Sequence, residues 1–211
     1  LYLQGNEVLH EKDLSTLRAL FVEHEKNDKV EAMLFERLTF WGSYHKLIKA
    51  YPDRYKFTPR AVKSSVGAYS IRDAMSFAVF DGWSTKGRYP RAIDTGMDIY
   101  RYGKVLISSQ LELKSNKAVH EQEITRNRDY LSEAVPLDFL TEFKGEHPKV
   151  MRELINSFSP DSFVNQRKKI HFKERLRLIE SSYYKKFGLP CWRNKRYKLL
   201  GGYSTKDRLD Y

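Results

Sequence analysis

The most regular alternation of apolar and polar residues in this chain lies between Ile93 and Lys114. The odd-numbered positions are mostly apolar and comprise Ile93, Thr95, Met97, Ile99, Val105, Ile107, Ser109, Leu111 and Leu113. The even-numbered positions are mostly polar and comprise Asp94, Gly96, Asp98, Tyr100, Ser108, Gln110, Glu112 and Lys114. Because alternate residues of a strand point to opposite faces, this pattern predicts two strands that each bury one face.

A tight turn between these strands is expected at Gly103, because glycine readily takes the positive φ that hairpin loops need. A three-residue loop at 102–104 keeps the apolar and polar faces sorted, whereas a two-residue loop would mix them. We therefore predict a β-hairpin over residues 92–114, with Asp94 facing Glu112 across the strand pair.

Helical spacing of apolar residues predicts helices on either side of the hairpin. The first begins at Asp13, which is a favourable N-cap residue, and ends near Lys26. Further helices are expected at 28–50, 70–80, 116–134, 137–144, 149–158 and 161–187. The predicted fold class is α/β (α+β): a small mixed sheet with a central β-hairpin flanked by helices, plus a basic C-terminal helical region.

Composition fits one core domain with an extension, because 41% of residues are hydrophobic and 14% are aromatic. Residues 1–5 (LYLQG) are similar to the remnant of an engineered protease-cleavage site. We expect residues 6–160 to form the core domain and 161–211 the basic helical region. Cys191 is the single cysteine, and no apolar run reaches the roughly 20 residues that cross a bilayer. The expectation is a soluble intracellular protein, in the cytoplasm or at the nucleoid or nucleus, that does not engage membranes.

Positive charge is concentrated near the C-terminus. The formal net charge is +11, and residues 165–198 contain 12 Lys or Arg against two Glu. Such a block matches a polyanion, so we expect a nucleic-acid partner, with DNA favoured over RNA. The candidate nucleic-acid-binding residues are Arg88, Arg91, Arg167, Lys168, Lys169, Lys173, Arg175, Arg177, Lys185, Lys186, Trp192, Arg193 and Arg196.

The polar face of the predicted hairpin carries the candidate chemistry. Asp94 and Glu112 would lie about 5 Å apart at Cβ, close enough to hold Mg²⁺ or Mn²⁺ with Asp98 as a further ligand. Lys114 on the same face could orient water or stabilise a phosphate. An acidic residue, a turn and then Glu-x-Lys resembles the active-site core of the PD-(D/E)xK nuclease superfamily. The resemblance implies metal-assisted phosphodiester hydrolysis by Asp94 (or Asp98), Glu112 and Lys114, with Glu36 as a further acidic candidate.

Two other interpretations stay open. The hairpin could be a structural element with solvated charges, in a non-catalytic nucleic-acid-binding or assembly protein that works through its basic C-terminal region. Ser84-Thr85 followed by Glu121-x-Glu123 is similar to arginine-specific ADP-ribosyltransferases, although that chemistry needs the glutamates in a loop and we predict a helix there. The leading hypothesis is a Mg²⁺- or Mn²⁺-dependent endonuclease, which a protein partner could target to its substrate.

Overall fold

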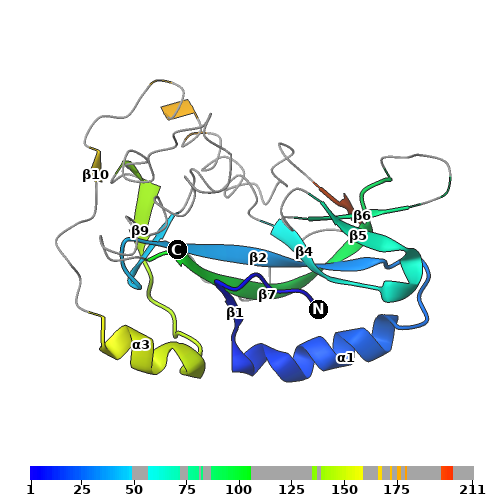
Figure 1. Cartoon of the computed structure of the whole chain (residues 1–211), viewed down its shortest axis with the longest axis horizontal. Coiled ribbons are helices and arrows are strands. Elements are labelled where there is room, and N and C mark those ends of the chain that lie inside the picture. The colour runs from blue at the N-terminus through cyan, green and yellow to red at the C-terminus, as the bar shows by residue number, and fades with distance from the viewer. Residues whose placement is uncertain are drawn as a thin grey trace, which may run out of the picture.

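The protein has an α+β fold built on a seven-stranded mixed sheet (Figure 1). The computed structural model describes residues 1–48, 57–71, 76–80, 82, 87–105, 135–136, 139–158, 166–167, 172, 175–176, 179 and 196–201. None of the helices within these residues is both long enough and apolar enough to span a membrane. The seven-stranded mixed sheet and the helices beside it confirm the prediction of a mixed sheet with flanking helices.

Two long parallel strands form the centre of the sheet. They are β2 (Ala32–Trp41), in which every residue is buried, and β7 (Arg91–Lys104). Antiparallel neighbours are β1 (Glu7–Leu9) beside β7, and β4 (Phe57–Val62) and β3 (Lys46–Ile48) beside β2. At the margins, β9 (Leu140–Glu142) pairs with β3, and β11 (Lys198–Leu199) runs parallel to the start of β7.

The remaining elements are short. Strands β5 (Ala68–Ile71) and β6 (Ser76–Val79) form an antiparallel pair, and β8 (Val135–Pro136) pairs with β10 (Gln166–Arg167). The helices are α1 (Leu14–His24) and α3 (Arg152–Asn156), and the 3₁₀ turns are η1 (Glu11–Asp13), η2 (Ser64–Val66) and η4 (Lys149–Met151). Helix α1 lies beneath β2 and β7 in Figure 1.

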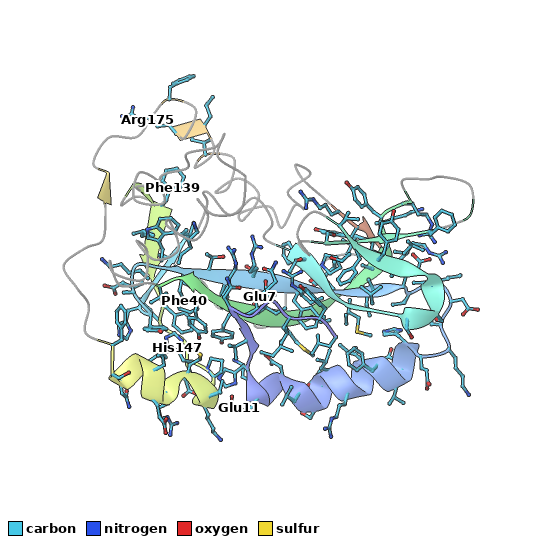
Figure 2. The ribbon with its side chains drawn as sticks, viewed as in Figure 1. Glu7, Glu11, Phe40, Phe139, His147 and Arg175 are labelled. Carbon is cyan, nitrogen blue, oxygen red and sulfur yellow. The ribbon has the colours of Figure 1, made fainter. Side chains whose placement is uncertain are left out.

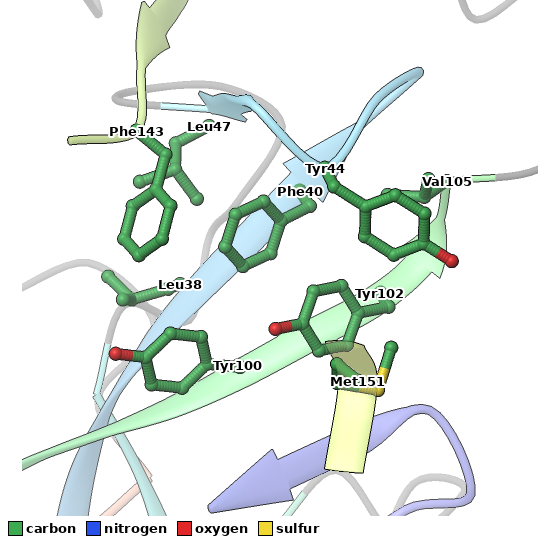
Figure 3. Close-up of a cluster of buried hydrophobic side chains, with 9 residues drawn as sticks. All are labelled: Leu38, Phe40, Tyr44, Leu47, Tyr100, Tyr102, Val105, Phe143 and Met151. Atoms are coloured by element: carbon green, nitrogen blue, oxygen red, sulfur yellow. The ribbon is translucent and has the colours of Figure 1, made fainter. Parts of the chain in front are cut away.

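Two large apolar clusters pack against the β2–β7 pair. In the first, which α1 covers, Leu17 packs among Met33, Phe35, Met97 and Ile99. The second is an aromatic cluster that gathers toward the carboxyl ends of the two strands (Figure 3), and its members are Leu38, Phe40, Tyr44, Leu47, Tyr100, Tyr102, Val105, Phe143 and Met151. Because both faces are buried, seven of the ten residues of β2 are apolar, which is typical of strands in parallel sheets.

That burial explains why the helix predicted at 28–50 is wrong. A continuous apolar run fits a buried helix as well as a strand that is buried on both faces, and residues 32–41 form the strand. The helix predicted at 70–80 is also wrong, because residues 70–71 belong to β5 and residues 76–79 to β6, and so is the one at 137–144, which contains β9. The helices predicted from Asp13 and over 149–158 are confirmed by α1 and by η4 with α3.

The hairpin prediction is half right. Its first strand is the central strand β7, but the predicted loop at 102–104 is wrong, because these residues belong to β7 and Gly103 does not have a positive φ. Residues 99–101, however, pair with β2 on one edge and with β1 on the other, so no edge remains there for the predicted partner strand. Gly103 serves another purpose, because a Cβ at this position would overlap the side chain of Asn6.

The two ends of the chain differ from expectation in smaller ways. Residues 1–5 contact the core: the Tyr2 amide donates to the Arg60 carbonyl at 2.7 Å, and Leu3 packs beside the α1 cluster. Within the predicted helix at 161–187, residues 166–167 form β10 instead, whereas Phe172, Arg175–Leu176 and Ile179 are helical. The predicted helix at 116–134 lies outside the described residues.

Candidate active site

Three carboxylates lie on one face of the β2–β7 pair. The strand register places Glu36 beside Asp98 and Leu34 beside Asp94. Directly paired residues of neighbouring strands point to the same face, and Leu34 and Glu36 share a face because they are two positions apart. Glu36, Asp94 and Asp98 therefore share the strand face opposite to Met33 and Phe35, the residues that α1 covers.

A β-bulge in β7 draws the two aspartates together. Between Asp94 and Asp98 the chain has four steps, but their partners on β2 are only two steps apart. The surplus is taken up at Gly96, whose φ is 71° and whose amide donates to Asp94 Oδ1 at 3.2 Å. The Thr95 hydroxyl also donates to the Leu34 carbonyl at 2.7 Å. The aspartates are thus separated by roughly 7 Å along the strand direction instead of about 13 Å.

Apolar clusters lie on either side of these carboxylates along the strands. Toward the amino ends of the strands lies a cluster of Ala32, Leu34, Ala92 and Tyr197, and toward the other end lies the aromatic cluster. Glu36 is only 7% exposed, whereas Asp94 and Asp98 are partly exposed. Each of the three also interacts with further groups of the protein. Carboxylates on a mostly apolar face are uncommon, and they are usually paired or bind metal ions.

The structure brings together some of the predicted site residues and does not describe others. Asp94 and Asp98 share one face of β7 by strand register, but Glu112 and Lys114 lie outside the described residues. Glu36, which we expected to belong to a helix, is the residue that pairs with Asp98 from a strand. Within the described part of the chain, no group of three His, Cys, Asp or Glu side chains is arranged to hold a metal ion.

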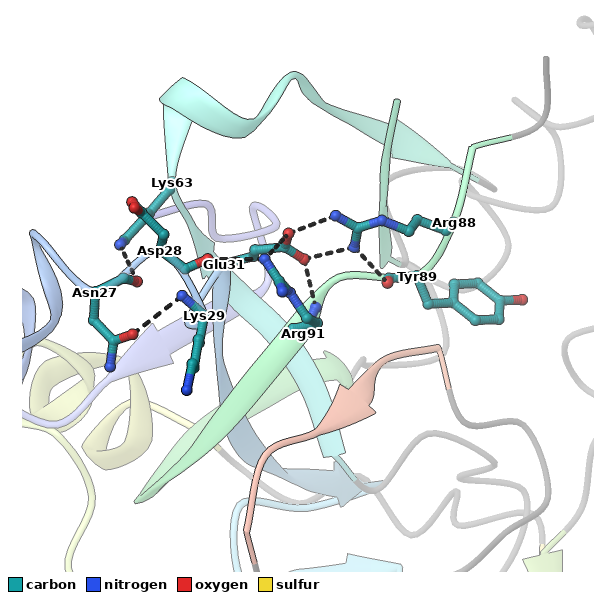
Figure 4. Close-up of polar contacts among 8 residues, drawn as sticks. All are labelled: Asn27, Asp28, Lys29, Glu31, Lys63, Arg88, Tyr89 and Arg91. Atoms are coloured by element: carbon teal, nitrogen blue, oxygen red, sulfur yellow. Dashed lines mark hydrogen bonds and ion pairs between the residues drawn. The ribbon is translucent and has the colours of Figure 1, made fainter. Parts of the chain in front are cut away.

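A second charged group lies where β2 and β7 begin (Figure 4). The carboxylate of Glu31, whose side chain is 2% exposed, accepts from both terminal nitrogens of Arg88 at 2.5 and 2.7 Å. It also accepts from the Arg91 amide at 2.8 Å and from Arg91 Nη2 at 2.9 Å. The hydrogen bonds from Arg88, then those from Arg91, outweigh burial and lower the pKa of Glu31 to about 2.

The other candidate basic residues are only partly described. The exposed Arg175 lies on the far side of β2 from α1 (Figure 2), and Arg167 belongs to β10. Arg196 is 6% exposed and its carbonyl accepts from the Ser76 hydroxyl at 3.3 Å, so this residue has little surface to offer a ligand. Outside the described residues lie Lys168, Lys169, Lys173, Arg177, Lys185, Lys186, Trp192 and Arg193.

No protein-family model, no curated protein sequence and no solved structure matches this chain significantly.

Proposed function

We propose that this protein is a metal-dependent nuclease that hydrolyses phosphodiester bonds in nucleic acid. The observation that supports this proposal best is the placement of Glu36 beside Asp98 on paired strands, with Asp94 brought close by the bulge. Glu112 and Lys114 remain part of the proposal as a further carboxylate and as the amine that stabilises the phosphate.

The chemistry of these side chains suits a hard divalent cation. Mg²⁺ and Mn²⁺ prefer oxygen ligands, and Mg²⁺ is commonly held by one or two carboxylates together with waters and substrate phosphates. Glu36 and Asp98 come from different strands and can supply such a pair. A bound ion would neutralise phosphate charge and lower the pKa of a coordinated water.

The roles of the protein's own groups follow from their positions. Strands β2 and β7 hold Glu36 and Asp98 on a rigid sheet, which keeps the carboxylates oriented. The amide of Gly96 fixes the carboxylate of Asp94 through its hydrogen bond. The apolar clusters on both sides exclude water from part of this face, which strengthens electrostatic interactions with a phosphate.

The substrate follows from charge. The basic block at 165–198 and the net charge of +11 favour a polyanion, and we propose DNA ahead of RNA. Long-range attraction of this kind raises the rate of encounter and is weakened by salt. Contacts of the basic region would hold the nucleic-acid strand while the carboxylates act on one phosphodiester.

Cleavage of labelled DNA and RNA with Mg²⁺ or Mn²⁺ tests the proposal. We expect Glu36→Gln and Asp98→Asn to reduce the cleavage rate by at least about 100-fold, with binding in EDTA nearly unchanged. Glu142→Gln removes an exposed carboxylate from β9 and is the matched control. Equal cleavage by the wild type, Glu36→Gln and Asp98→Asn would refute the proposal.

A non-catalytic nucleic-acid-binding protein is the second candidate, and the exposure of Arg175 within the basic region favours it. This alternative predicts salt-sensitive binding without cleavage. Calorimetric titration with Mn²⁺ separates the two functions. Stoichiometric binding of Mn²⁺ that is lost in Glu36→Gln supports the nuclease, and the lack of any heat of binding supports the alternative.

A further inference from the structure

We propose that the sheet end where β2 and β7 begin is a second, separate binding surface for the phosphate backbone of nucleic acid. Arg88 and Arg91 would contact the phosphates, and the buried Glu31 would position both arginines. We call this surface the arginine platform, and its cationic members are Lys29, Lys63, Arg88, Arg91 and Lys198. The choice of nucleic acid as the partner rests on the proposed function, but the platform needs neither the metal nor the carboxylates of the active site.

Their ion pairs hold the two arginines in place and leave both side chains partly exposed. Glu31 binds Arg88 through both of its carboxylate oxygens, and Arg91 Nη2 donates to the Asp28 carbonyl at 2.8 Å as well as to Glu31. The side chains of Arg88 and Arg91 are nevertheless 38% and 36% exposed. Glu31 is shared between the two guanidinium groups, and both groups still present exposed surface.

Three lysines extend this charge. Lys198 in β11 pairs in register with Arg91, and its side chain is exposed. Lys63 Nζ donates to the Asn27 carbonyl at 2.7 Å, which keeps the ammonium group beside the loop that leads into β2. Lys29 is exposed in the same loop (Figure 4). Figure 4 draws the acidic side chains of Asp28 and Glu31 together with the basic ones of Lys29, Lys63, Arg88 and Arg91.

The positioning role of Glu31 has a physical basis. A long arginine side chain loses rotamer freedom when it binds a phosphate, and side chains that are already ordered lose less. Guanidinium groups also match phosphate oxygens with their planar fork of donors. The exposed ring of Tyr89, 44% accessible and next to Arg88, adds a surface on which a base can stack.

The platform is distinct from the active site. Arg91 and Asp94 both belong to β7, but they are an odd number of residues apart and so point to opposite faces of the strand. They are also about 10 Å apart along the strand. Loss of platform contacts should therefore weaken substrate binding without changing the chemistry at the carboxylates.

Fluorescence anisotropy with labelled single-stranded and duplex DNA, in EDTA and over a range of salt concentrations, tests the proposal. We expect Arg88→Gln with Arg91→Gln to reduce affinity about 10-fold or more and to lower the slope of log K against log salt by about 2, since each phosphate contact contributes roughly 0.9. The matched control is Lys12→Gln with Arg152→Gln, which removes two exposed charges from η1 and α3 and should change affinity less than twofold.

Glu31→Gln tests positioning against simple charge. This substitution makes the protein more positive, so a purely electrostatic surface would bind DNA more tightly. If Glu31 positions the arginines, affinity falls severalfold despite the added charge. Arg88→Lys keeps the charge but loses the fork of donors, and it should also bind more weakly; it provides the same test if Glu31→Gln unfolds.

Three results would overturn the proposal: the double arginine variant binding DNA like its control, Glu31→Gln binding more tightly, or a loss of affinity confined to anionic phospholipid vesicles with DNA binding unchanged. Failure of the nuclease proposal would look different. Cleavage would then be absent from the wild type in Mg²⁺ or Mn²⁺, while the dependence of DNA binding on Arg88 and Arg91 in EDTA would remain.

Discussion

Buried carboxylates occur in two kinds of surroundings within one sheet. Glu7 and Glu31 are each held by arginine side chains, at 2.7 Å from Arg60 in the first case and at 2.5 Å from Arg88 in the second. Glu36 of β2 instead has Asp98 beside it on the neighbouring strand β7. Carboxylates of the first kind thus bind arginine side chains, and the carboxylate of the second kind lies beside another acidic residue on the paired strand.

This difference separates structural residues from candidate catalytic ones. A buried ion pair that loses one partner leaves an uncompensated charge, which costs far more than the intact pair contributes. Opposed like charges on paired strands are destabilising by a smaller amount, and removing one should relieve the repulsion. Substitutions of the two kinds of carboxylate should therefore change stability in opposite directions.

The largest effect on stability is expected at Arg60. Its side chain and that of Glu7 are fully buried, and they are joined by two hydrogen bonds of 2.7 and 2.8 Å. Arg60→Met should lower the free energy of unfolding by roughly 3–5 kcal/mol, because the charge of Glu7 stays buried without its partner. Denaturant titration followed by circular dichroism measures the change.

The double variant Arg60→Met with Glu7→Gln is the control for this prediction. It removes both charges, so it should be clearly more stable than Arg60→Met alone. If the double variant were destabilised by the sum of the two single effects, the pair would not act as a unit, and the distinction between the two kinds of carboxylate would lose its basis.

Acid should break the ion pairs of Glu31 and so lower the free energy of unfolding. Its pKa is lowered from 4.5 to about 2, so its stabilising effect is complete above pH 4.5 and is lost as the pH falls toward 2. The loss can reach about 3 kcal/mol, less whatever solvent screening of the partly exposed arginines removes. Unfolding measured from pH 6 to 2 should show a smaller decline in Glu31→Gln than in the wild type, and Glu142→Gln should resemble the wild type.

A histidine in the aromatic cluster produces a separate step at higher pH. The ring of His147 lies 5.0 Å from that of Phe40, and its Nδ1 is 2.9 Å from the Tyr102 hydroxyl (Figure 2). Burial, with help from His45, lowers the pKa of His147 to about 4. The unfolded chain binds the proton more readily, so stability should fall as the pH drops from 6.5 to 4, by up to about 3 kcal/mol.

His147→Gln should remove that decline, whereas His24→Gln, at the end of α1, should leave it in place. The two acid steps then overlap only near pH 4 to 4.5, so the effect of Glu31 can be measured below pH 4. An unchanged decline between pH 6.5 and 4 in His147→Gln would show that other groups titrate there.

The sequence predicted part of this arrangement, and the reasons for success and failure are physical. Alternation identified β7 because one side of its pattern is clearly polar, and apolar spacing identified α1, although Asp13 makes no side-chain capping hydrogen bond there. The alternation did not identify β2, because both faces of this strand are buried and its pattern does not alternate. Periodicity alone cannot then distinguish a strand from a helix. Because of this error, Glu36, which lies in strand β2, was expected in a helix.

Pairing between strands that lie far apart in the sequence was the second feature that could not be predicted. A local hairpin was expected to bring Asp94 near Glu112, but β7 is flanked by β1 and β2, whose residues lie about 60 to 90 positions earlier in the chain. Such register depends on tertiary packing and has no local signal. The Asp-x-Gly spacing at Asp94 and Gly96 was visible in the sequence and could have suggested a bulge.

The smallest change in stability is expected at Glu36 itself, and it has the opposite sign. Glu36→Gln should raise the free energy of unfolding in EDTA by roughly 0.2–1 kcal/mol, because it removes one of two opposed carboxylates. In Mn²⁺ the order should reverse: the wild type gains about 2.7 kcal/mol at a concentration 100 times its dissociation constant, and the variant gains little. Thermal unfolding with and without Mn²⁺ measures both effects, and Asp98→Asn should reproduce them. Destabilisation of Glu36→Gln in EDTA, together with equal stabilisation of both proteins by Mn²⁺, would place Glu36 with the structural carboxylates.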